Sequence, residues 1–229
     1  MKRIVVLVLL VASTLAVMAQ SKSGAWSVTP HVGVSRSSMT GSVASYELAD
    51  GELEKIKPHS LLGFVGGVDV MYKASDIVGI SAGVSFVQAG CKYKVEDEER
   101  KGEAVHDRYM RMNYIAVPVL AHSYLTPRFS INAGIEPTFL LKANNHEEHQ
   151  TYDVDADGKK SNFKEFELDY DVKNAFRKFG LSIPIGVSYE YENVVLGALY
   201  HVGVFNVSKF GDSSRNSILE VSVGYKFNL

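Results

Sequence analysis

The densest run of carboxylates that could bind a metal ion is the segment DVDADG at residues 153–158. Alternating aspartates followed by a glycine begin the calcium loop of EF-hand proteins, in which carboxylate oxygens surround the Ca²⁺ ion. The twelfth position of such a loop should hold a bidentate Glu, but here it holds Lys164. We therefore expect either a looser Ca²⁺ site at Asp153, Asp155 and Asp157 or an exposed acidic turn, in which Asp and Gly are favoured.

A second group of potential ligands, His146-Glu-Glu-His149, lies just upstream. Two His residues at this spacing can share a transition metal if the segment is helical, but the pair lacks the Glu placement of the zinc-protease motif. No nucleophile stands in a motif with a base and an orienting group, since His106-Asp107 is an isolated pair and Cys91 is the single cysteine. The sequence therefore favours a protein that is not an enzyme and that needs no cofactor other than the Ca²⁺ considered above.

The first 19 residues have the three parts of a secretory signal peptide. Lys2 and Arg3 precede an apolar stretch that begins at Ile4, and Val17-Met-Ala19 is a small-residue cleavage site. The apolar stretch is shorter than the roughly 20 residues that a membrane helix needs. We therefore expect a signal peptide at residues 1–19, followed by one domain at residues 20–229.

Positive and negative charges are nearly balanced along the chain. The 24 Lys and Arg residues against 26 Asp and Glu residues give a formal net charge of −2, and no basic stripe is visible. Nucleic acid is therefore not an expected partner. Glycine and tyrosine are abundant and only six prolines occur, which is typical of strands joined by tight turns.

Eight segments alternate between apolar and polar residues, and a strand places such residues on opposite faces. The last segment shows the pattern without a break, with Leu219, Val221 and Val223 on one face and Glu220 and Ser222 on the other. The predicted strands are residues 26–35, 61–73, 77–93, 108–124, 129–141, 179–191, 194–205 and 218–229. For the fourth and seventh strands, the alternation does not decide which set of residues faces outward.

The connections between these strands alternate in length. Short turns at residues 73–76, 125–128 and 191–193 alternate with long, charged connections at residues 36–60, 94–107, 142–178 and 206–216. Outer-membrane barrels show this alternation, with short turns in the periplasm and long loops outside. Because no backbone group can stay unpaired in hydrocarbon, such a sheet must close. We predict an all-β fold, an eight-stranded antiparallel up-and-down transmembrane β-barrel.

The facing of the strands assigns two further sets of residues. A charge on the lipid face is costly, so ionisable residues of the polar face should point into the lumen, which eight strands make barely wide enough for side chains. We expect a polar lumen network of ion pairs around Lys226, joined by His201; its residues are Asp69, Glu136, Glu190, Glu220 and Lys226. Aromatic residues near strand ends should form girdles at the membrane–water interfaces, chiefly Trp26, Tyr72, Tyr191, Tyr225 and Phe227.

Four stretches resemble the PorT-like outer-membrane β-barrel family: Tyr114-Ile-Ala-Val-Pro118-Val-Leu, Asn132-Ala-Gly134-Ile-Glu-Pro137, Lys178-Phe-Gly180-Leu and Val223-Gly-Tyr-Lys-Phe227. The similarity spans nearly the whole of residues 20–229. It implies insertion into the bacterial outer membrane, with membrane lipid and the barrel-assembly machinery as partners, and it supplies no catalytic residues. Asn228 and Leu229 extend past the terminal Phe that is usual in the family.

These features favour a barrel whose long extracellular loops form a binding, adhesion or envelope-assembly surface for an extracellular or envelope protein or polysaccharide. Two alternatives stay open. One is a small gated channel for ions or small solutes. The other is a soluble, lipocalin-like periplasmic barrel that binds an apolar ligand, which would turn Tyr225 and Phe227 inward and Glu220 and Lys226 toward water.

Overall fold

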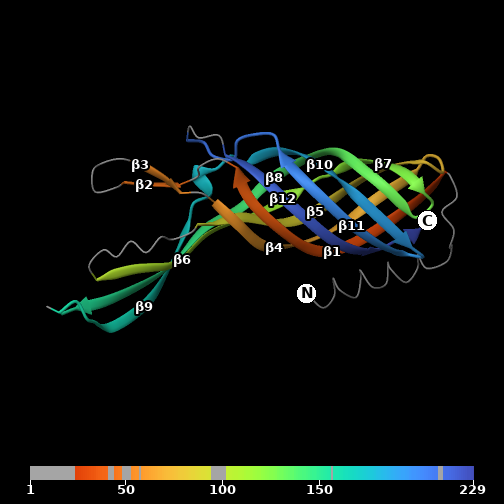
Figure 1. Ribbon diagram of the computed structural model, residues 1–229. Coiled ribbons are helices and arrows are strands. Elements are labelled where there is room, and N and C mark those ends of the chain that lie inside the picture. The colour runs from red at the N-terminus through yellow and green to blue at the C-terminus, as the bar shows by residue number, and fades with distance from the viewer. Residues whose placement is uncertain are drawn as a thin grey trace, which may run out of the picture.

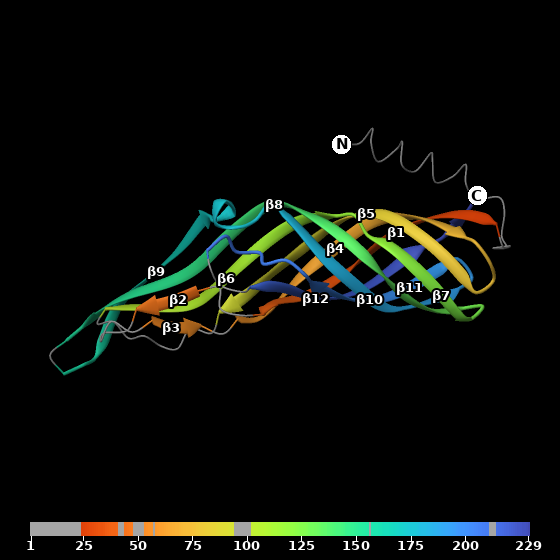
Figure 2. The ribbon, with the colours of Figure 1, turned by 90° about the horizontal axis from the view of Figure 1, so that it is seen from above.

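The computed structural model describes residues 24–40, 44–47, 53–56, 58–93, 102–155, 157–210 and 214–229. The predicted signal peptide at residues 1–19 lies outside the described residues. The main body is an eight-stranded antiparallel ring, seen from two sides in Figures 1 and 2. Its strands are β1 (Ala25–Thr40), β4 (Pro58–Lys73), β5 (Val78–Tyr93), β6 (Glu103–Ala116) continued by β7 (Val119–Thr126), β8 (Phe129–Val154), β10 (Phe179–Tyr191), β11 (Val194–Gly203) and β12 (Arg215–Tyr225).

Each strand of the ring pairs with its neighbours along the chain, and pairing of β12 with β1 closes the ring. The short β13 (Phe227–Asn228) also pairs with β1. Three elements lie outside the ring: the hairpin of β2 (Ala44–Glu47) and β3 (Leu53–Ile56), the strand β9 (Lys160–Asp171), and the 3-10 helix η1 (Lys173–Ala175). Among the described residues, no helix is long and apolar enough to cross a membrane.

The predicted alternation of turns is confirmed at the short-turn end, where β4–β5, β7–β8 and β10–β11 are joined tightly. The prediction of a loop at residues 142–178 is wrong. In the structure β8 continues to Val154 and the chain returns as β9, so the two strands form a hairpin that extends past the ring (Figures 1 and 2). Residues 145–151 of β8 are polar on both faces, so the apolar–polar alternation that marks a strand is absent there, although β9 retains it at Phe166, Leu168 and Tyr170.

The predicted fourth strand is interrupted at Val117 and Pro118. Proline has no backbone N–H to donate to the ladder, so a break at this position is expected. Two hydrogen bonds hold the interruption in the wall: Val117 N–H donates to the carbonyl of Pro137, and Gly83 N–H donates to the carbonyl of Pro118.

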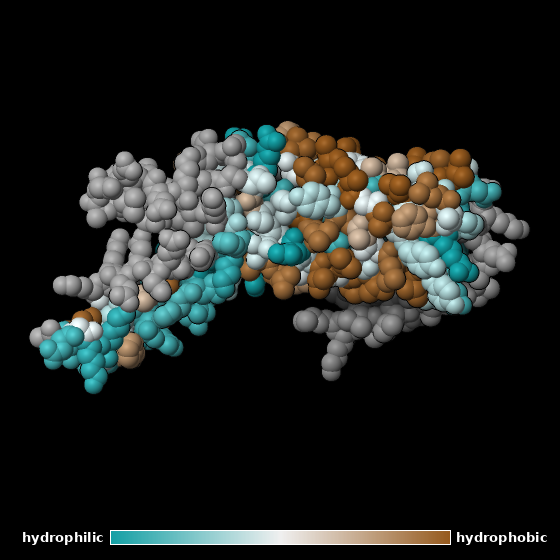
Figure 3. Space-filling view, in the orientation of Figure 1, coloured by the Kyte–Doolittle hydropathy of each residue, from teal (hydrophilic) through white to brown (hydrophobic). Residues whose placement is uncertain are grey.

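The apolar face of the ring points outward, as predicted. Val221 is 52% exposed whereas its neighbour Glu220 is 5% exposed. In the space-filling view the apolar side chains form a belt over the ring, and the hairpin beyond it is hydrophilic (Figure 3). The lipocalin-like alternative, which needs the reverse facing, is therefore wrong. The structure also shows which residues of β7, part of the predicted fourth strand, point into the ring: Leu120 and Tyr124 are buried, while Val119 is exposed.

The interior of the ring has two halves with different chemistry. Polar residues fill the half near the short turns, but the half near the long connections holds a cluster of buried apolar side chains, here called the apolar plug. Its members include Met39, Val87, Cys91, Met112, Tyr114 and Phe176. Phe176 follows η1, so the segment after β9 returns to the ring and packs on this cluster.

Candidate functional site

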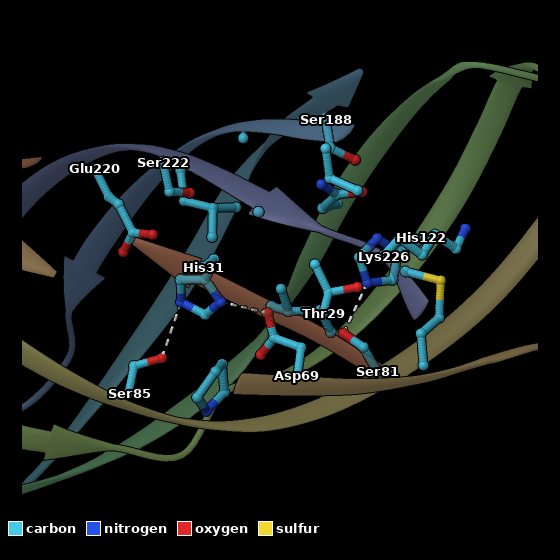
Figure 4. Close-up of a pocket in the computed structure, with 18 of the residues that line it drawn as sticks. Thr29, His31, Asp69, Ser81, Ser85, His122, Ser188, Glu220, Ser222 and Lys226 are labelled. Atoms are coloured by element: carbon cyan, nitrogen blue, oxygen red, sulfur yellow. Dashed lines mark hydrogen bonds and ion pairs between the residues drawn. The ribbon is translucent and has the colours of Figure 1, made fainter. Parts of the chain in front are cut away.

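The polar half of the interior encloses a cavity of about 90 Å³ (Figure 4). Residues of every strand of the ring contribute to its lining, among them His31, His122, His201 and the four predicted carboxylates Asp69, Glu136, Glu190 and Glu220. A water molecule needs roughly 10–15 Å³ measured in this way, so the cavity has room for roughly six to nine waters. It is much smaller than the aqueous channel of a porin.

His201 lies between two buried carboxylates in this cavity. Its Nδ1 is 3.0 Å from Oε1 of Glu136, and its Nε2 is 3.3 Å from Oε2 of Glu220. All three side chains are at most 5% exposed. An imidazolium carries an N–H on both nitrogens, so one protonated His can neutralise part of the charge of both carboxylates.

A second group joins β1, β4 and β5. His31 places its Nδ1 3.2 Å from Oδ2 of Asp69, and its Nε2 3.3 Å from the hydroxyl of Ser85. Figure 4 shows the imidazole between the two partners. On the neighbouring strands, the hydroxyl of Ser81 is hydrogen-bonded to Nε2 of His122 at 2.8 Å.

A third group lies closest to the short turns. Nζ of Lys226 donates to Oε2 of Glu190 at 2.7 Å, and the hydroxyl of Tyr124 donates to Oε1 of the same carboxylate at 2.7 Å. The five predicted network residues therefore all line the cavity, but the structure divides them. Lys226 pairs with Glu190, while Glu136 and Glu220 meet at His201 and Asp69 meets His31.

Ser85, His31 and Asp69 have the order of a nucleophile, a base and an orienting carboxylate. Nucleophilic catalysis also needs N–H groups that stabilise an oxyanion, and space for a substrate. All three residues lie inside strands that pair on both sides, so their backbone groups serve the ladder. The small cavity has no room for an ester or peptide. The arrangement is best explained as mutual hydrogen bonding of buried polar groups.

The second candidate region is the sheet beyond the ring, here called the arm: residues 103–107 of β6, residues 145–154 of β8, and β9. The strand register gives it two faces. Its apolar face carries Val105, Phe166, Leu168 and Tyr170. Its acidic face carries Asp107, Glu148, Glu165, Glu167, Asp169 and Asp171. Each strand thus contributes to both faces, as alternation requires.

Ion pairs join β6 to β8 where the arm meets the ring. Nε of Arg108 on β6 is 2.8 Å from Oε1 of Glu147 on β8, and Nε2 of His149, also on β8, is 3.0 Å from Oε2 of the same carboxylate. Burial raises the pKa of Glu147, but hydrogen bonds from Tyr170 and His149 and the charge of Arg108 outweigh it, so the pKa of this carboxyl is lowered.

The lowered pKa of Glu147 predicts how the arm responds to acid. A carboxyl with a lowered folded-state pKa stabilises the folded form above its unfolded-state pKa, and that contribution is lost as pH falls through the folded-state value. We expect a nitroxide attached at Phe163→Cys, in a Cys91→Ala background, to keep one mobility from pH 8 to about 5 and to become more mobile below about pH 4.5. The readout is the electron paramagnetic resonance spectrum.

The matched control is the same labelled protein with Glu147→Gln. It should show the higher mobility at every pH and no acid transition, because the neutral amide cannot pair with Arg108. An acid transition of equal size in the Glu147→Gln protein would contradict the role of this carboxylate.

On the other face of the arm, the imidazole of His146 stacks on Tyr109 at 4.7 Å between ring centroids and lies 3.0 Å from Oδ1 of Asp169. The hydrogen bond with Asp169 raises the pKa of His146. The proposal that His146 and His149 share a metal is wrong, because it requires a helix. The segment is a strand, and the two residues point to opposite faces.

The three predicted calcium ligands lie at the tip of the β8–β9 hairpin. Oδ1 of Asp155 accepts hydrogen bonds from the N–H groups of Asp157 (3.0 Å) and Lys159 (2.8 Å), which close the turn. Oδ2 of Asp153 accepts from the side-chain amide of Asn162 at 2.8 Å. The structure does not bring these carboxylates together, and within the described ranges no group of three or more acidic, His or Cys side chains could hold a metal ion.

The predicted girdle residues all lie at the short-turn end of the ring. Trp26 packs on Tyr72 with ring centroids 5.0 Å apart, and Tyr225 packs on Phe227 at 4.8 Å. The guanidinium of Arg128 lies 5.4 Å from the ring centre of Tyr191. Aromatic pairs near the other end of the belt, such as Phe139 with Phe179 at 5.6 Å, are additional to the prediction.

Five ionisable residues of the cavity and His201 were predicted from the sequence, but His31 and His122 of the cavity were not, nor was Tyr124, which donates a hydrogen bond to Glu190. His31 lies on the polar side of the first predicted strand, and this position alone indicated that its side chain points into the ring. His122 and Tyr124 lie on the strand whose facing was open, because apolar residues that fill the interior gave both of its faces the same character.

Comparison with known proteins supports the fold. A family model described as "Outer membrane protein beta-barrel domain" matches residues 18–210. A comparison with curated proteins gave no match. Among solved structures, the chain is similar to the attachment invasion locus protein Ail of Yersinia pestis (13% identity, covering 90% of this chain and 99% of that chain, TM-score 0.45).

Two further solved structures are similar at the same level. Neisserial surface protein A is 15% identical, with 87% of this chain and 97% of that chain covered and a TM-score of 0.47. The outer membrane protein OprG from Pseudomonas aeruginosa is 14% identical, with 90% and 98% covered and a TM-score of 0.40. The family match spans most of the chain, and the closed ring with an apolar exterior agrees with it. The chain therefore belongs to the outer-membrane protein β-barrel domain family and is a protein of the bacterial outer membrane.

Proposed function

We propose that this protein is a membrane-anchored scaffold that presents its arm outside the cell as a binding surface, without catalysis. The observation that carries the proposal is the continuation of β6, β8 and β9 beyond the ring as an ordered sheet. In an outer-membrane barrel the short turns lie in the periplasm and the long connections outside. The arm lies at the end with the long connections, from which the β2–β3 hairpin also projects (Figures 1 and 2).

The interior of the ring supports a surface role over transport. The apolar plug fills the outer half, with Cys91 and Met112 completely buried. The polar half contains a cavity of about 90 Å³, enough for roughly six to nine waters and much less than the aqueous channel of a porin. These two features disfavour the small gated channel, which would need the packed side chains of the plug to move apart.

The surface of the arm supports recognition of a protein or a polysaccharide. Phe166, Leu168 and Tyr170 on its apolar face are each about 40% exposed. Partly exposed aromatic residues beside charged ones are frequent in protein interfaces and in carbohydrate-facing surfaces. Isolated apolar residues on a surface are ordinary, but here three follow each other on one face of one strand.

Further parts of the proposal follow from the sequence. We assign the chain to the PorT-like branch of the family, supported by Tyr114-Ile-Ala-Val-Pro118 and Asn132-Ala-Gly134. We propose that residues 1–19 are a signal peptide, that the barrel-assembly machinery inserts the domain, and that membrane lipid surrounds the apolar belt. The aromatic pairs at the short-turn end suit an interfacial girdle.

An arm-shortened variant tests the function. Asn144 and Asp171 are cross-strand partners, so residues 145–170 can be replaced by Asn-Gly, which favours a two-residue hairpin turn. We expect this variant to keep a heat-modifiable, membrane-inserted barrel. A photocrosslinking amino acid placed at Phe166 of the full-length protein in intact cells should give adducts with protein or polysaccharide that the same probe at Leu125, in β7 beside the β7–β8 turn, does not give.

The arm-shortened variant should also compete poorly with the full-length protein for those adducts when both are supplied as purified barrels. Equal competition by the two proteins, or equal adducts from positions 166 and 125, would contradict the proposed function.

A further inference from the structure

In the described part of the chain, the outer edge of the arm is the edge strand β9. β9 pairs with β8 on one side and with no other described strand. All twelve of its residues are exposed. An edge strand of this length presents a row of N–H and C=O groups that can pair with an added strand.

Two rows of side chains follow this edge. On the acidic face β9 carries Glu165, Glu167, Asp169 and Asp171, and on the apolar face Phe166, Leu168 and Tyr170. Contacts to β8 hold part of both rows in place: Phe166 stacks on His149 at 5.2 Å between ring centroids, and Asp169 pairs with His146. The edge is therefore an ordered template in which charge and apolar surface lie on opposite sides.

A second copy of this chain is not expected to pair with the outer edge of β9. Antiparallel pairing of two β9 strands about a two-fold axis joins like faces, so carboxylates would lie opposite carboxylates. Like charges directly opposite each other destabilise a sheet. Parallel pairing would place the apolar row of one copy beside the acidic row of the other. The acidic row thus disfavours self-association and favours a partner with the opposite charge.

We propose that the β9 edge binds an extended segment of another protein by strand addition. The segment carries Lys or Arg at alternate positions, facing the acidic row, and apolar residues at the positions between them, covering Phe166, Leu168 and Tyr170. Main-chain hydrogen bonds supply affinity in this mode of recognition, and the alternate side chains supply specificity. The inference rests on the proposed function, because it names the partner class of the same arm.

The test uses the full-length protein in nanodiscs of zwitterionic lipid and a nine-residue peptide that alternates Lys with Val. Binding is measured by fluorescence anisotropy, with empty nanodiscs and the arm-shortened variant as controls. Two further peptides carry N-methyl groups on alternate residues, one on the odd set and one on the even set. Because β9 can pair with one edge of the peptide, we expect one methylated peptide to bind like the parent and the other to bind at least tenfold more weakly.

Charge reversal on the edge gives the matched pair of protein variants. Glu165→Lys with Glu167→Lys should weaken binding of the parent peptide at least tenfold. Asp76→Lys with Glu192→Lys makes the same change in net charge at exposed positions of the short turns and should leave binding unchanged. Absence of binding, equal binding to empty nanodiscs or the arm-shortened variant, equal binding of both methylated peptides, or a protein dimer formed through β9 would each overturn strand addition.

The peptide-binding and crosslinking measurements together distinguish a failure of strand addition from a failure of the proposed function. Adducts at position 166 in cells, together with no discrimination between the two methylated peptides, would leave the arm as a binding surface and exclude strand addition. Loss of those adducts would remove the proposed function itself.

Discussion

Replacing His201 with alanine is expected to lower the free energy of unfolding of the barrel by about 3–5 kcal/mol, the usual cost of removing one partner from a buried ion pair. The imidazole contacts Glu136 and Glu220, and both carboxylates are buried. Without it, two buried carboxylates of like charge face each other with no cation between them. The measurement is urea unfolding of the refolded protein in lipid vesicles, followed by the shift of the folded band on a gel run without boiling.

Two comparisons make this expectation specific. His59→Ala removes a His from an exposed position of β4 and should change stability by less than about 0.5 kcal/mol. Adding Glu136→Gln and Glu220→Gln to the His201→Ala protein removes the unpaired charges and should restore part of the loss. If His201→Ala unfolds at the urea concentration of the wild type, the ion pairs described for His201 do not stabilise the barrel.

The second large effect is expected for Gly90→Ala. Gly90 lies in β5 with φ of +144°, a backbone conformation that residues with a Cβ rarely adopt. A Cβ at this position would also overlap the backbone carbonyl oxygen of Met110 on β6. Backbone strain of this kind costs about 1–3 kcal/mol, and overpacking costs about 1–3 kcal/mol more. We expect the variant to lose most of the heat-modifiable band after refolding.

Gly66→Ala is the matched control for this second prediction. Gly66 lies in the neighbouring strand β4 at an ordinary negative-φ position, and the nearest atom to an added Cβ there is the carbonyl oxygen of His31 at 3.8 Å. This variant should refold like the wild type. Similar yields of folded protein from the two substitutions would show that neither the dihedral angle nor the approach of β6 constrains Gly90.

The strands of the ring were predictable because each has one face in lipid and one in the interior. Val221 and Glu220 differ in burial in the way that alternation predicts. The same signal fails where the two faces of a strand have the same character. Residues 145–151 are polar on both faces, and Tyr114 and Met112 make the inner face of β6 as apolar as its outer face. The alternation in β9 was visible in the sequence, but without a partner strand at residues 145–154 it did not indicate a hairpin, and the apolar plug gave no alternation at all.

The sequence pattern predicted which ionisable residues line the cavity, but not which of them form ion pairs with each other. The polar side of the alternation predicted that Glu136, Glu190 and Lys226 point into the lumen, and in the structure these three residues line the cavity. Which of them meet depends on the register between strands, and a single sequence does not specify it. The prediction of one network around Lys226 missed the separate position of His201, which pairs with residues of β8 and β12.

The apolar plug has a consequence for the cell that carries this protein. A wide barrel with an open, polar lumen is an aqueous channel across the outer membrane. Tyr114, Phe176 and their neighbours instead fill one half of this narrow ring with packed apolar side chains. We therefore expect that raising the copy number of this protein leaves the passive permeability of the envelope unchanged.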